Sequence, residues 1–449
     1  MTRHLIVGRL GQGDRTAIPK AADEQKTELS FGAADGLAFG IGRALEDLRS
    51  LGLHPSEIGA DLLILAAHVH AADTRISRET EAQDGWTREI RLVVPVSNPA
   101  IWRTTEQTLK RALDFLTGDR WRIGFRARPR THSSVVVAPD PLLGGIPYDG
   151  ISLFSGGLDS LIGAIDRLDS AHSPLFVSHA GEGAVSASQE ACFDGLKNHF
   201  QRNDLDRLRV WMTFEGGLVE DVASESTTRG RSFLFFALAA AAGSGLGRSF
   251  EVQVPENGLI ALNVPLDQLR LGAPSTRTTH PFHIARWNDL LAQLGIQGSL
   301  VNPYWNKTKG EMALECTDQA LLMRLAVHSL SCSSPAKARW LGLPQGHCGH
   351  CLPCLIRRAS LLDRDPTPYI LDDLKAASLD TRKAEGVQVR SFQLAIERLR
   401  RRPELAATLV HKPGSLSDVP HQTAELADVY RRGLAEVGKL LKGVRAAPG

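Results

Sequence analysis

Four of the six cysteines lie close together in the last third of the chain. They are Cys332, Cys348, Cys351 and Cys354, in the pattern C-x15-C-x2-C-x2-C. A chain of 449 residues can build its core without disulfides, so metal or thiol chemistry explains the clustering better. Four thiolates suit a tetrahedral Zn²⁺ ion, and a C-x2-C turn can place two sulfurs on one ion. We therefore predict a zinc site, with an iron–sulfur cluster as the alternative metal centre.

A glycine-rich segment near the middle of the chain could bind phosphate. It consists of Phe154, Ser155, Gly156, Gly157, Leu158, Asp159 and Ser160, between an apolar run and a helical pattern. Paired glycines let the backbone approach an anion closely, and the N–H groups and dipole of a following helix favour negative charge. The hydroxyls of Ser155 and Ser160 can donate hydrogen bonds, whereas Asp159 is expected to face Mg²⁺ or a basic side chain. The segment is not a Walker loop, because the pattern G-x4-G-K-[ST] is absent. The alternative to a phosphate site is a tight strand–helix turn that needs glycine.

The segments around the glycine-rich loop alternate between strand-like and helical patterns. Strands are predicted at 151–154, 175–179, 208–214 and 250–254. Helices are predicted at 161–168, 189–200 and 232–242. This alternation predicts an α/β fold with a doubly wound parallel sheet, in which ligands bind at the carboxyl ends of the strands. Cys192 and Cys316 fall on predicted helices and are expected in the core.

The rest of the chain suggests a region on either side of this sheet. Residues 1–147 are expected to form an α+β domain that could dock a partner, with strands at 89–96 and 119–128 and helices at 34–51 and 101–116. The apolar run 61–70 could be helix or strand. Prolines and glycines at 139–149 predict a linker to a central domain at 148–360. Residues 361–449 are expected to be a helical extension, with helices at 392–402 and 423–441. Asp73, Arg75, Trp86, Trp102 and Trp121 are candidate surface features of the first region, although packing is the commoner role for tryptophan.

Composition excludes several classes of function. There are 52 Lys and Arg against 50 Asp and Glu, so no global basic field would attract nucleic acid, and nucleic-acid binding is not expected. The most apolar later run, 233–242, is too short to span a bilayer, and the N-terminus lacks the pattern of a signal peptide. We therefore expect a cytoplasmic protein that does not bind membranes.

The two motifs together resemble the QueC family of PP-loop (N-type) ATP pyrophosphatases, which carry S-G-G-x-D-S and a C-terminal four-cysteine zinc site. The resemblance covers residues 151–361, about half the chain. Three further segments carry it: Gly230-Arg231-Ser232, residues 303–311 with Lys309 and Glu311 in matching places, and Ser331-Cys332 with CGHCLPC at 348–354. The family fold is of the HUP, Rossmann-like type.

The resemblance implies an ATP- and Mg²⁺-dependent reaction. Family members activate the carboxylate of 7-carboxy-7-deazaguanine by adenylation, form an amide with ammonia, and dehydrate it to a nitrile. The loop from Phe154 to Ser160 would hold pyrophosphate, Arg231 and Lys309 would balance phosphate charge, and the zinc would be structural. Because they follow a predicted strand end, Glu256 and Asn257 are candidate contacts to the guanine edge of the substrate, with an Asx-type turn before Gly258 as the alternative. Further candidate contacts are Arg229, Arg277 and His280, for which the alternative is the stabilisation of a polar loop.

The chain departs from the family where the substrate would lie, after the second strand and at 272–281. In Pro255-Glu256-Asn257-Gly258 with Asn263-Val-Pro265, in residues 275–281, and in its length, it resembles the branch that includes QatC of the bacterial Qat anti-phage system. This suggests that a different amine captures the acyl-adenylate, and we expect that amine to be the N-terminus of a protein partner from the same defence system. The alternatives are nitrile formation with ammonia, a PP-loop sulfur transferase that modifies tRNA, and a non-enzymatic scaffold.

Overall fold

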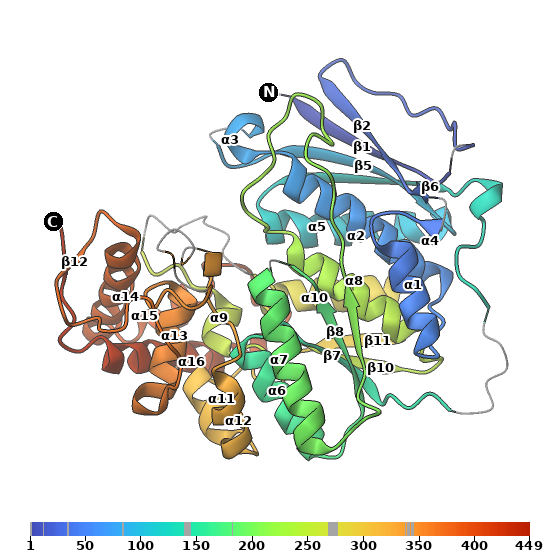
Figure 1. The fold of residues 1–449 in the computed structure, drawn as a ribbon. Coiled ribbons are helices and arrows are strands. Elements are labelled where there is room, and N and C mark those ends of the chain that lie inside the picture. The colour runs from blue at the N-terminus through green and yellow to red at the C-terminus, as the bar shows by residue number, and fades with distance from the viewer. Residues whose placement is uncertain are drawn as a thin grey trace.

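The structure is a computed structural model that describes most of the chain (Figure 1). The described residues are 2–11, 13–33, 36–82, 85–138, 145–181, 183–267, 277–336, 338, 342 and 345–449. Residues 139–144 of the expected linker and residues 268–276, which include much of the divergent segment 272–281, lie outside the described residues. Among the described helices, none is both long and apolar enough to cross a membrane.

The first region contains a four-stranded sheet in the order β2-β1-β5-β6. Its strands are β1 (Arg3–Arg9), β2 (Glu24–Ser30), β5 (Glu89–Val96) and β6 (Arg120–Ala127). All three pairings are parallel, so the α+β expectation was wrong and the region is an α/β unit. The reason is the long connections, which return the chain to the same end of the sheet before each new strand; those before β5 and β6 contain helices, whereas the one from β1 to β2 has no assigned helix among its described residues. The crossover from β5 to β6 uses α4 (Pro99–Thr104) and α5 (Glu106–Thr117).

The path from β2 to β5 is longer and includes the helix at the centre of the molecule. It contains a short antiparallel pair and three helices: β3 (Gly32–Ala33), β4 (Gly36–Leu37), α1 (Ile41–Ser50), α2 (Glu57–Arg75) and α3 (Arg78–Glu81). The ambiguous run 61–70 is therefore helical. It is buried on every side from Gly59 to Thr74, as expected for a helix that is apolar all round.

The second sheet is parallel, with five strands in the order β11-β10-β7-β8-β9. Its strands are β7 (Gly150–Leu153), β8 (Pro174–His179), β9 (Arg207–Val210), β10 (Phe250–Gln253) and β11 (Gly298–Val301). The chain moves from β7 to β9 on one side, and then crosses to β10 and β11 on the other. This order is that of a doubly wound sheet, and its switch point lies between β7 and β10.

Helices cover both faces of the second sheet. Those involved are α6 (Leu158–Asp169), α7 (Gly183–Phe200), α8 (Arg231–Ser244) and α10 (Pro281–Gln293). Strand β8 shows the two faces: Phe176 joins the core beneath α6 and α7, while Leu175 and Val177 join the core beneath α8. The strands and helices expected in the central region are present, with ends that differ from the expected ones by up to six residues, at the start of α7.

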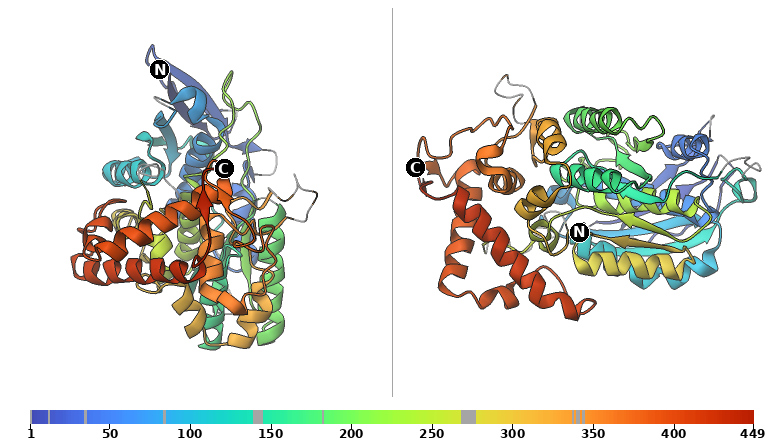
Figure 2. Two further views of the ribbon diagram at one scale, coloured as in Figure 1. Left: turned by 90° about the vertical axis from the view of Figure 1, so that its left-hand side faces the viewer. Right: turned by 90° about the horizontal axis from the view of Figure 1, so that it is seen from below.

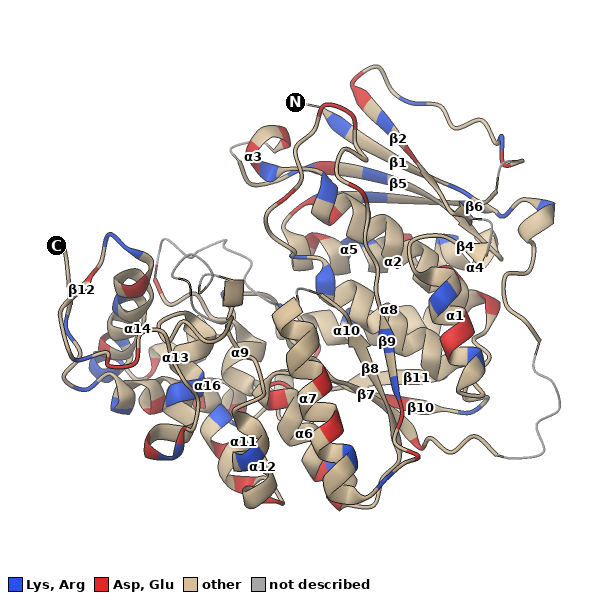
Figure 3. Ribbon diagram, viewed as in Figure 1, with Lys and Arg blue, Asp and Glu red and all other residues tan. Residues whose placement is uncertain are grey.

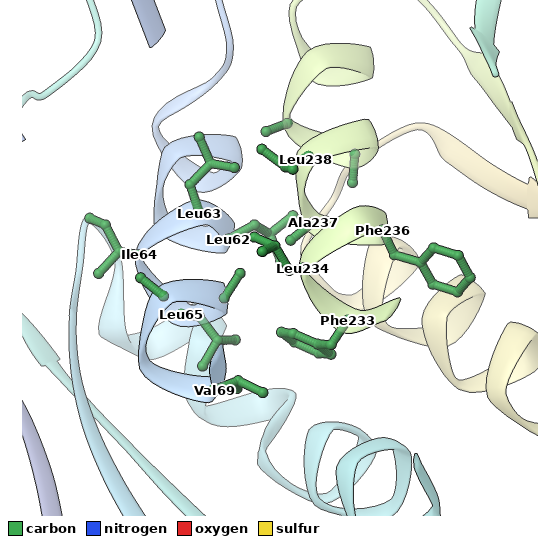
Figure 4. Close-up of a cluster of buried hydrophobic side chains, with 14 of the residues drawn as sticks. Leu62, Leu63, Ile64, Leu65, Val69, Phe233, Leu234, Phe236, Ala237 and Leu238 are labelled. Atoms are coloured by element: carbon green, nitrogen blue, oxygen red, sulfur yellow. The ribbon is translucent and has the colours of Figure 1, made fainter. Parts of the chain in front are cut away.

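The two sheets share one hydrophobic core, because α2 packs along α8 (Figure 4). Leu62 and Leu65 of α2 point toward Phe233 and Leu234 of α8, while Phe236 points away from α2. Figure 1 shows the resulting layers: the first sheet, then α2 and α5, then α8 and α10, then the second sheet. The first region is therefore continuous with the central core, and the division of the chain into three domains stays a prediction.

Five further helices form a cluster with its own core beside the second sheet (Figure 2). They are α9 (Gly258–Leu262), α13 (Leu352–Leu361), α14 (Ala384–Arg401), α15 (Leu405–Leu409) and α16 (Thr423–Leu440), with the short pair β12 (Leu379–Asp380) and β13 (Ala446–Ala447). Helices α11 (Lys309–Glu315) and α12 (Gln319–Ala326) instead pack into the core beneath α6 and α7. The helices expected at 392–402 and 423–441 correspond to α14 and α16. Basic and acidic residues are interspersed along the described elements (Figure 3), which agrees with the balanced charge.

Candidate functional site

The candidate site lies at the carboxyl edge of the second sheet, at its switch point. Strand β7 leads into the glycine-rich loop and α6, and β10 leads into Glu256 and Asn257. The segment after β11 brings Lys309 to the same place, because its ammonium lies 3.1 Å from a carboxylate oxygen of Asp159. Three segments separated by up to about 150 residues therefore meet at the edge where doubly wound sheets bind ligands.

The loop requires glycine at one of its two glycine positions. Gly156 has φ +79°, and a Cβ there would lie 3.0 Å from both Cγ and the backbone N of Gln189. Gly157 caps α6 with φ −84°, a conformation open to other residues. The carbonyl of Gly156 accepts hydrogen bonds from Ser188 Oγ and from the backbone N–H of Leu330, both at 2.8 Å. The turn is therefore held from two sides.

Hydroxyl groups gather at the start of α6. The Oγ atoms of Ser155 and Ser160 lie 3.1 Å apart, and Ser155 Oγ accepts from the N–H of Gly157 at 3.3 Å. Ser155 is exposed, whereas Ser160 is buried. The positive end of the α6 dipole lies at the same place, so the loop offers an anion both hydroxyl donors and a favourable field.

Asp159 faces a basic side chain, one of the two environments expected for it. The Asp159 carboxylate forms an ion pair with Lys309 and also accepts a hydrogen bond from Nδ2 of Asn257 at 2.8 Å. Asn257 also caps α9, because its Oδ1 accepts from the N–H of Ile260. Lys309 is 5% exposed. The cation is therefore held beside the loop, within a largely buried set of polar groups.

Glu256 lies half-buried next to this pair. Thr279 donates its hydroxyl hydrogen to the Glu256 carboxylate. Desolvation, with a smaller contribution from the nearby Asp159 carboxylate, raises the pKa of Glu256 to about 7, although the hydrogen bond from Thr279 opposes the rise. The backbone of Glu256 is fixed by the side-chain amide of Asn302, which accepts from its N–H at 3.3 Å and donates to its C=O at 2.7 Å. A carboxyl that titrates near neutral pH is therefore held at the site.

Arg231 is the first residue of α8 and lies on the opposite side of the loop, beside the end of β8. A Cβ at Gly181, just after β8, would lie 2.8 Å from the Arg231 guanidinium. The side chain of Gln189 links this strand end to the loop, since its Nε2 donates to the C=O of Ser155 at 3.4 Å and of His179 at 3.3 Å. Burial, and then the Arg231 charge, lower the pKa of His179 to about 3, so its imidazole is neutral.

The start of α8 is held by a carboxylate from the first region. Asp73 of α2 accepts from the N–H of Gly230 at 2.7 Å. Asp73 is fully buried and also pairs with Arg78 and Arg88, at 3.2 and 3.4 Å. The expectation of a surface position for Asp73 was wrong, because sequence does not show that α2 is enclosed between a sheet and a helix. Trp102 and Trp121 are also fully buried.

Three predicted substrate contacts are engaged elsewhere in the structure. Arg229 stacks 4.5 Å from the ring centroid of Trp86, and Arg277 lies 4.9 Å from that of Phe115. Both arginines also donate hydrogen bonds to backbone carbonyls of α5. Arg229 donates to the C=O of Thr117, and Arg277 donates to the C=O of Phe115. His280 caps α10 by accepting from the N–H of Phe282, and burial lowers the pKa of His280 to about 3.

The four clustered cysteines meet as predicted and could hold a metal ion such as zinc. Their sulfur atoms all lie within 4.8 Å of one another, with Cys332 to Cys351 and Cys348 to Cys354 both at 3.9 Å. A tetrahedral ion with bonds of about 2.3 Å needs sulfur separations of about 3.8 Å. Backbone N–H groups also point at the sulfurs, as from Cys351 to Cys348 at 3.3 Å.

The other two cysteines and the nearby histidine play different parts. Cys192 and Cys316 are buried, as expected. His347 is not part of the sulfur cluster, because its Nε2 accepts from the N–H of Ser331 at 3.0 Å. Burial lowers the pKa of His347 to about 3, which keeps that nitrogen available as an acceptor.

The cysteine element is attached directly to the loop. Ser331, next to Cys332, accepts through Oγ from the N–H of Leu158, the first residue of α6, at 3.3 Å. Fully buried Arg357 of α13 donates to the same Oγ at 3.4 Å and to Ser329 at 2.8 Å. Sequence reasoning noted Ser331 only as part of a motif. Its contact with α6 could not be found from spacing, because the two residues are separated by 173 positions.

The site therefore combines a helix N-terminus, two serine hydroxyls and a buried lysine–aspartate pair, with a titratable carboxyl next to them. Such a set is suited to a polyphosphate and a second polar molecule. No protein-family model matches the chain, and no curated protein matches it.

Proposed function

We propose that the protein is an ATP-dependent adenylating ligase of the QueC-like type, which transfers AMP to a carboxylate similar to 7-carboxy-7-deazaguanine and then forms an amide. The observation that carries the proposal is the Ser155–Ser160 loop at the switch point of the sheet, with Lys309 paired to its acid. The sequence resemblance to PP-loop enzymes points to the same chemistry, since those enzymes hold the pyrophosphate of ATP in this loop.

In the proposed first step, a carboxylate oxygen attacks the α-phosphorus and the bond to the β-phosphate oxygen breaks, releasing pyrophosphate. The α6 N-terminus and the hydroxyls of Ser155 and Ser160 bind the leaving pyrophosphate. Lys309 and Arg231 offset the negative charge that develops on it. Asp159 would hold Mg²⁺, which neutralises phosphate charge when bound. Asp159 would then share its carboxylate between that ion and Lys309.

In the proposed second step, a neutral amine attacks the acyl carbon and AMP leaves. Glu256 and Asn257 lie beside the loop, where a carboxylate can accept from the ring N–H and amino group of a deazaguanine. We propose that the amine is the N-terminus of a protein partner from the same QatC-type defence system. Ammonia, followed by nitrile formation, is the alternative acceptor.

The buried cysteines disfavour a sulfur transferase. Such an enzyme needs a thiolate that can carry sulfur, yet burial raises the pKa of both Cys192 and Cys316 to about 12. The other four cysteines form the sulfur cluster that could hold a metal ion.

Exchange of labelled pyrophosphate into ATP tests the adenylation step. Exchange is expected only with the carboxylate present, and Ser155→Ala and Asp159→Ala should reduce it at least a hundredfold (~2.7 kcal/mol). Ser170→Ala and Asp169→Ala change the same residue types at the exposed far end of α6 and should leave exchange unchanged. Persistent exchange in the loop variants would show that the site is elsewhere. Intact-mass measurement of candidate partners, with ATP and the carboxylate, then distinguishes protein conjugation from nitrile formation.

A further inference from the structure

The C-terminal helix α16 reaches the short helix that carries Lys309. Its Glu436 accepts a hydrogen bond from the backbone N–H of Gly310 at 3.2 Å and another from the hydroxyl of Thr308. These two residues directly flank Lys309 in the sequence. One carboxylate from the end of the chain therefore binds both neighbours of the lysine.

Position 310 is shaped for this contact. A Cβ on Gly310 would lie 2.5 Å from Glu436 Oε1, closer than atoms of that kind can approach. Any larger residue would push the carboxylate away. The glycine is thus matched to the carboxylate that packs against it.

A second side chain of α16 binds the same helix, one turn before Glu436. Arg432 forms an ion pair with Glu311 and donates to the C=O of Asn306 at 2.9 Å. Because Glu311 also closes the capping box with Thr308, both α16 side chains act on the first turn of α11.

Helix α11 needs such support, since it has only seven residues. A helix of that length is marginal by itself, and its place depends on packing. Lys309 is its first residue, and the Lys309 ammonium lies 3.1 Å from Asp159 at the loop. A shift of the first turn would therefore move the ammonium away from the loop.

We propose that Glu436 is a positioning residue for Lys309, so that the C-terminal helix is part of the phosphate site. The significance for catalysis rests on the proposed role of Lys309 toward the phosphates. The positional claim itself concerns only where the lysine lies, and can be tested without turnover.

The first test measures the accessibility of Lys309 in the full-length protein. Acylation of lysines, followed by peptide mass spectrometry, is expected to label Lys307 readily and Lys309 slowly, since their side chains are 36% and 5% exposed. Glu436→Ala should raise the labelling rate of Lys309 about tenfold or more and leave that of Lys307 unchanged. Glu436→Gln should largely restore protection, because its amide can still bond to Gly310 and Thr308.

Gly310→Ala provides a second, independent perturbation. It displaces the carboxylate without removing a polar group, and alanine favours helix formation. We expect Gly310→Ala to expose Lys309 to labelling as Glu436→Ala does. In the double variant, Gly310→Ala should change the labelling rate of Lys309 little further, because the Glu436 carboxylate with which the new methyl group would clash is absent. Glu404→Ala, which removes an exposed carboxylate from the same helical region, is the control. Unchanged Lys309 labelling in both Glu436→Ala and Gly310→Ala would overturn the proposal.

Pyrophosphate titration calorimetry connects position to binding. The affinity for pyrophosphate is expected to fall about tenfold (~1.4 kcal/mol) in Glu436→Ala and Gly310→Ala, and to stay near the wild-type value in Glu404→Ala. If the wild type binds no pyrophosphate while Glu436→Ala still exposes Lys309, the proposed function fails but the positioning role stands. If pyrophosphate binds equally to all variants and Lys309 stays protected, the proposed function survives and the positioning role fails.

Discussion

Replacing Gly156 by alanine is the most direct test of the phosphate loop. Gly156 is the one loop residue with a left-handed backbone, at φ +79°. It also lies against the first half of α7, where Gln189 is buried and bonded to the backbone of the loop and of β8. An added methyl group therefore meets two unfavourable conditions at once.

The expected magnitude follows from these two conditions. An L-residue in the left-handed region costs about 1–2 kcal/mol relative to glycine. The new Cβ would lie 3.0 Å from a backbone nitrogen of a helix, which has little freedom to move. If the loop keeps its shape, the free energy of unfolding falls by about 1–2 kcal/mol. If the loop shifts to relieve the strain, the same energy appears as weaker binding of pyrophosphate, by about 5–30-fold.

The assay combines urea unfolding with calorimetric titration of ATP and pyrophosphate. Gly183→Ala is the matched control, because Gly183 begins the same helix α7, has an ordinary φ and offers open space to a Cβ. We expect Gly183→Ala to match the wild type in both measurements, while Gly156→Ala loses stability, affinity or both, with a sum of about 1–2 kcal/mol. Wild-type stability together with wild-type affinity in Gly156→Ala would refute the requirement for glycine at position 156 of this loop.

Three further predictions concern the metal cluster, the buried ion network and the titratable carboxyl. Metal analysis should find about one zinc per wild-type chain and little in Cys354→Ser, whereas Cys192→Ser should retain it; equal content in both variants would contradict the four-sulfur site. Asp73→Ala removes one carboxylate from beside fully buried Arg88 and should lower the free energy of unfolding by about 3–5 kcal/mol in urea titration; a loss under about 1 kcal/mol would show that the network is dispensable. Because the pKa of Glu256 rises from its ordinary value of 4.5 to about 7 on folding, the folded protein keeps a proton there that the unfolded chain releases. The stabilising contribution of that proton is complete below pH 4.5 and is lost as the pH rises toward 7, so Glu256→Gln should gain up to about 3 kcal/mol relative to wild type between pH 5 and pH 8. Parallel stability profiles for the two proteins would contradict the raised pKa.

The regions on either side of the central sheet take part in the site through one carboxylate each. Asp73 of the first region binds Gly230, just before Arg231, and Glu436 of the C-terminal helix binds the residues around Lys309. In the proposed reaction, Arg231 and Lys309 are the two cations that face the phosphates. The regions outside the central sheet therefore hold the two side chains to which the proposed reaction assigns the balancing of phosphate charge.

Local patterns in the sequence predicted the local chemistry. The C-x2-C-x2-C spacing predicts sulfurs that meet because the turns between them are short, and Cys332 joins them as expected. The loop could be predicted because a strand, two glycines and a helix follow one another directly. Alternating apolar runs predicted four of the five strands of the second sheet, β7 to β10, and the helices α6, α7 and α8, because hydrogen bonds within a helix depend on neighbouring residues. Strand β11 and helix α10 were not predicted.

Patterns that depend on distant packing were predicted less well. The run 61–70 was ambiguous, because a helix enclosed on all sides has no polar face to reveal its period. Strand β2 gave no clear signal in the sequence, since it carries several charged residues, and β1 was not predicted either. The parallel arrangement of the first sheet followed from crossovers that only the fold reveals.

By itself, the sequence determined which residues could do chemistry: the sulfur ligands, the loop hydroxyls and glycines, and the acids and bases near them. Only the tertiary structure decided which of these act together. It paired Asp159 with Lys309, turned Arg229 and Arg277 toward α5, and brought Glu436 to the first turn of α11. The physical reason is that such contacts join residues more than a hundred positions apart, whose meeting depends on how the helices pack around the sheets and not on the spacing of residues along the chain.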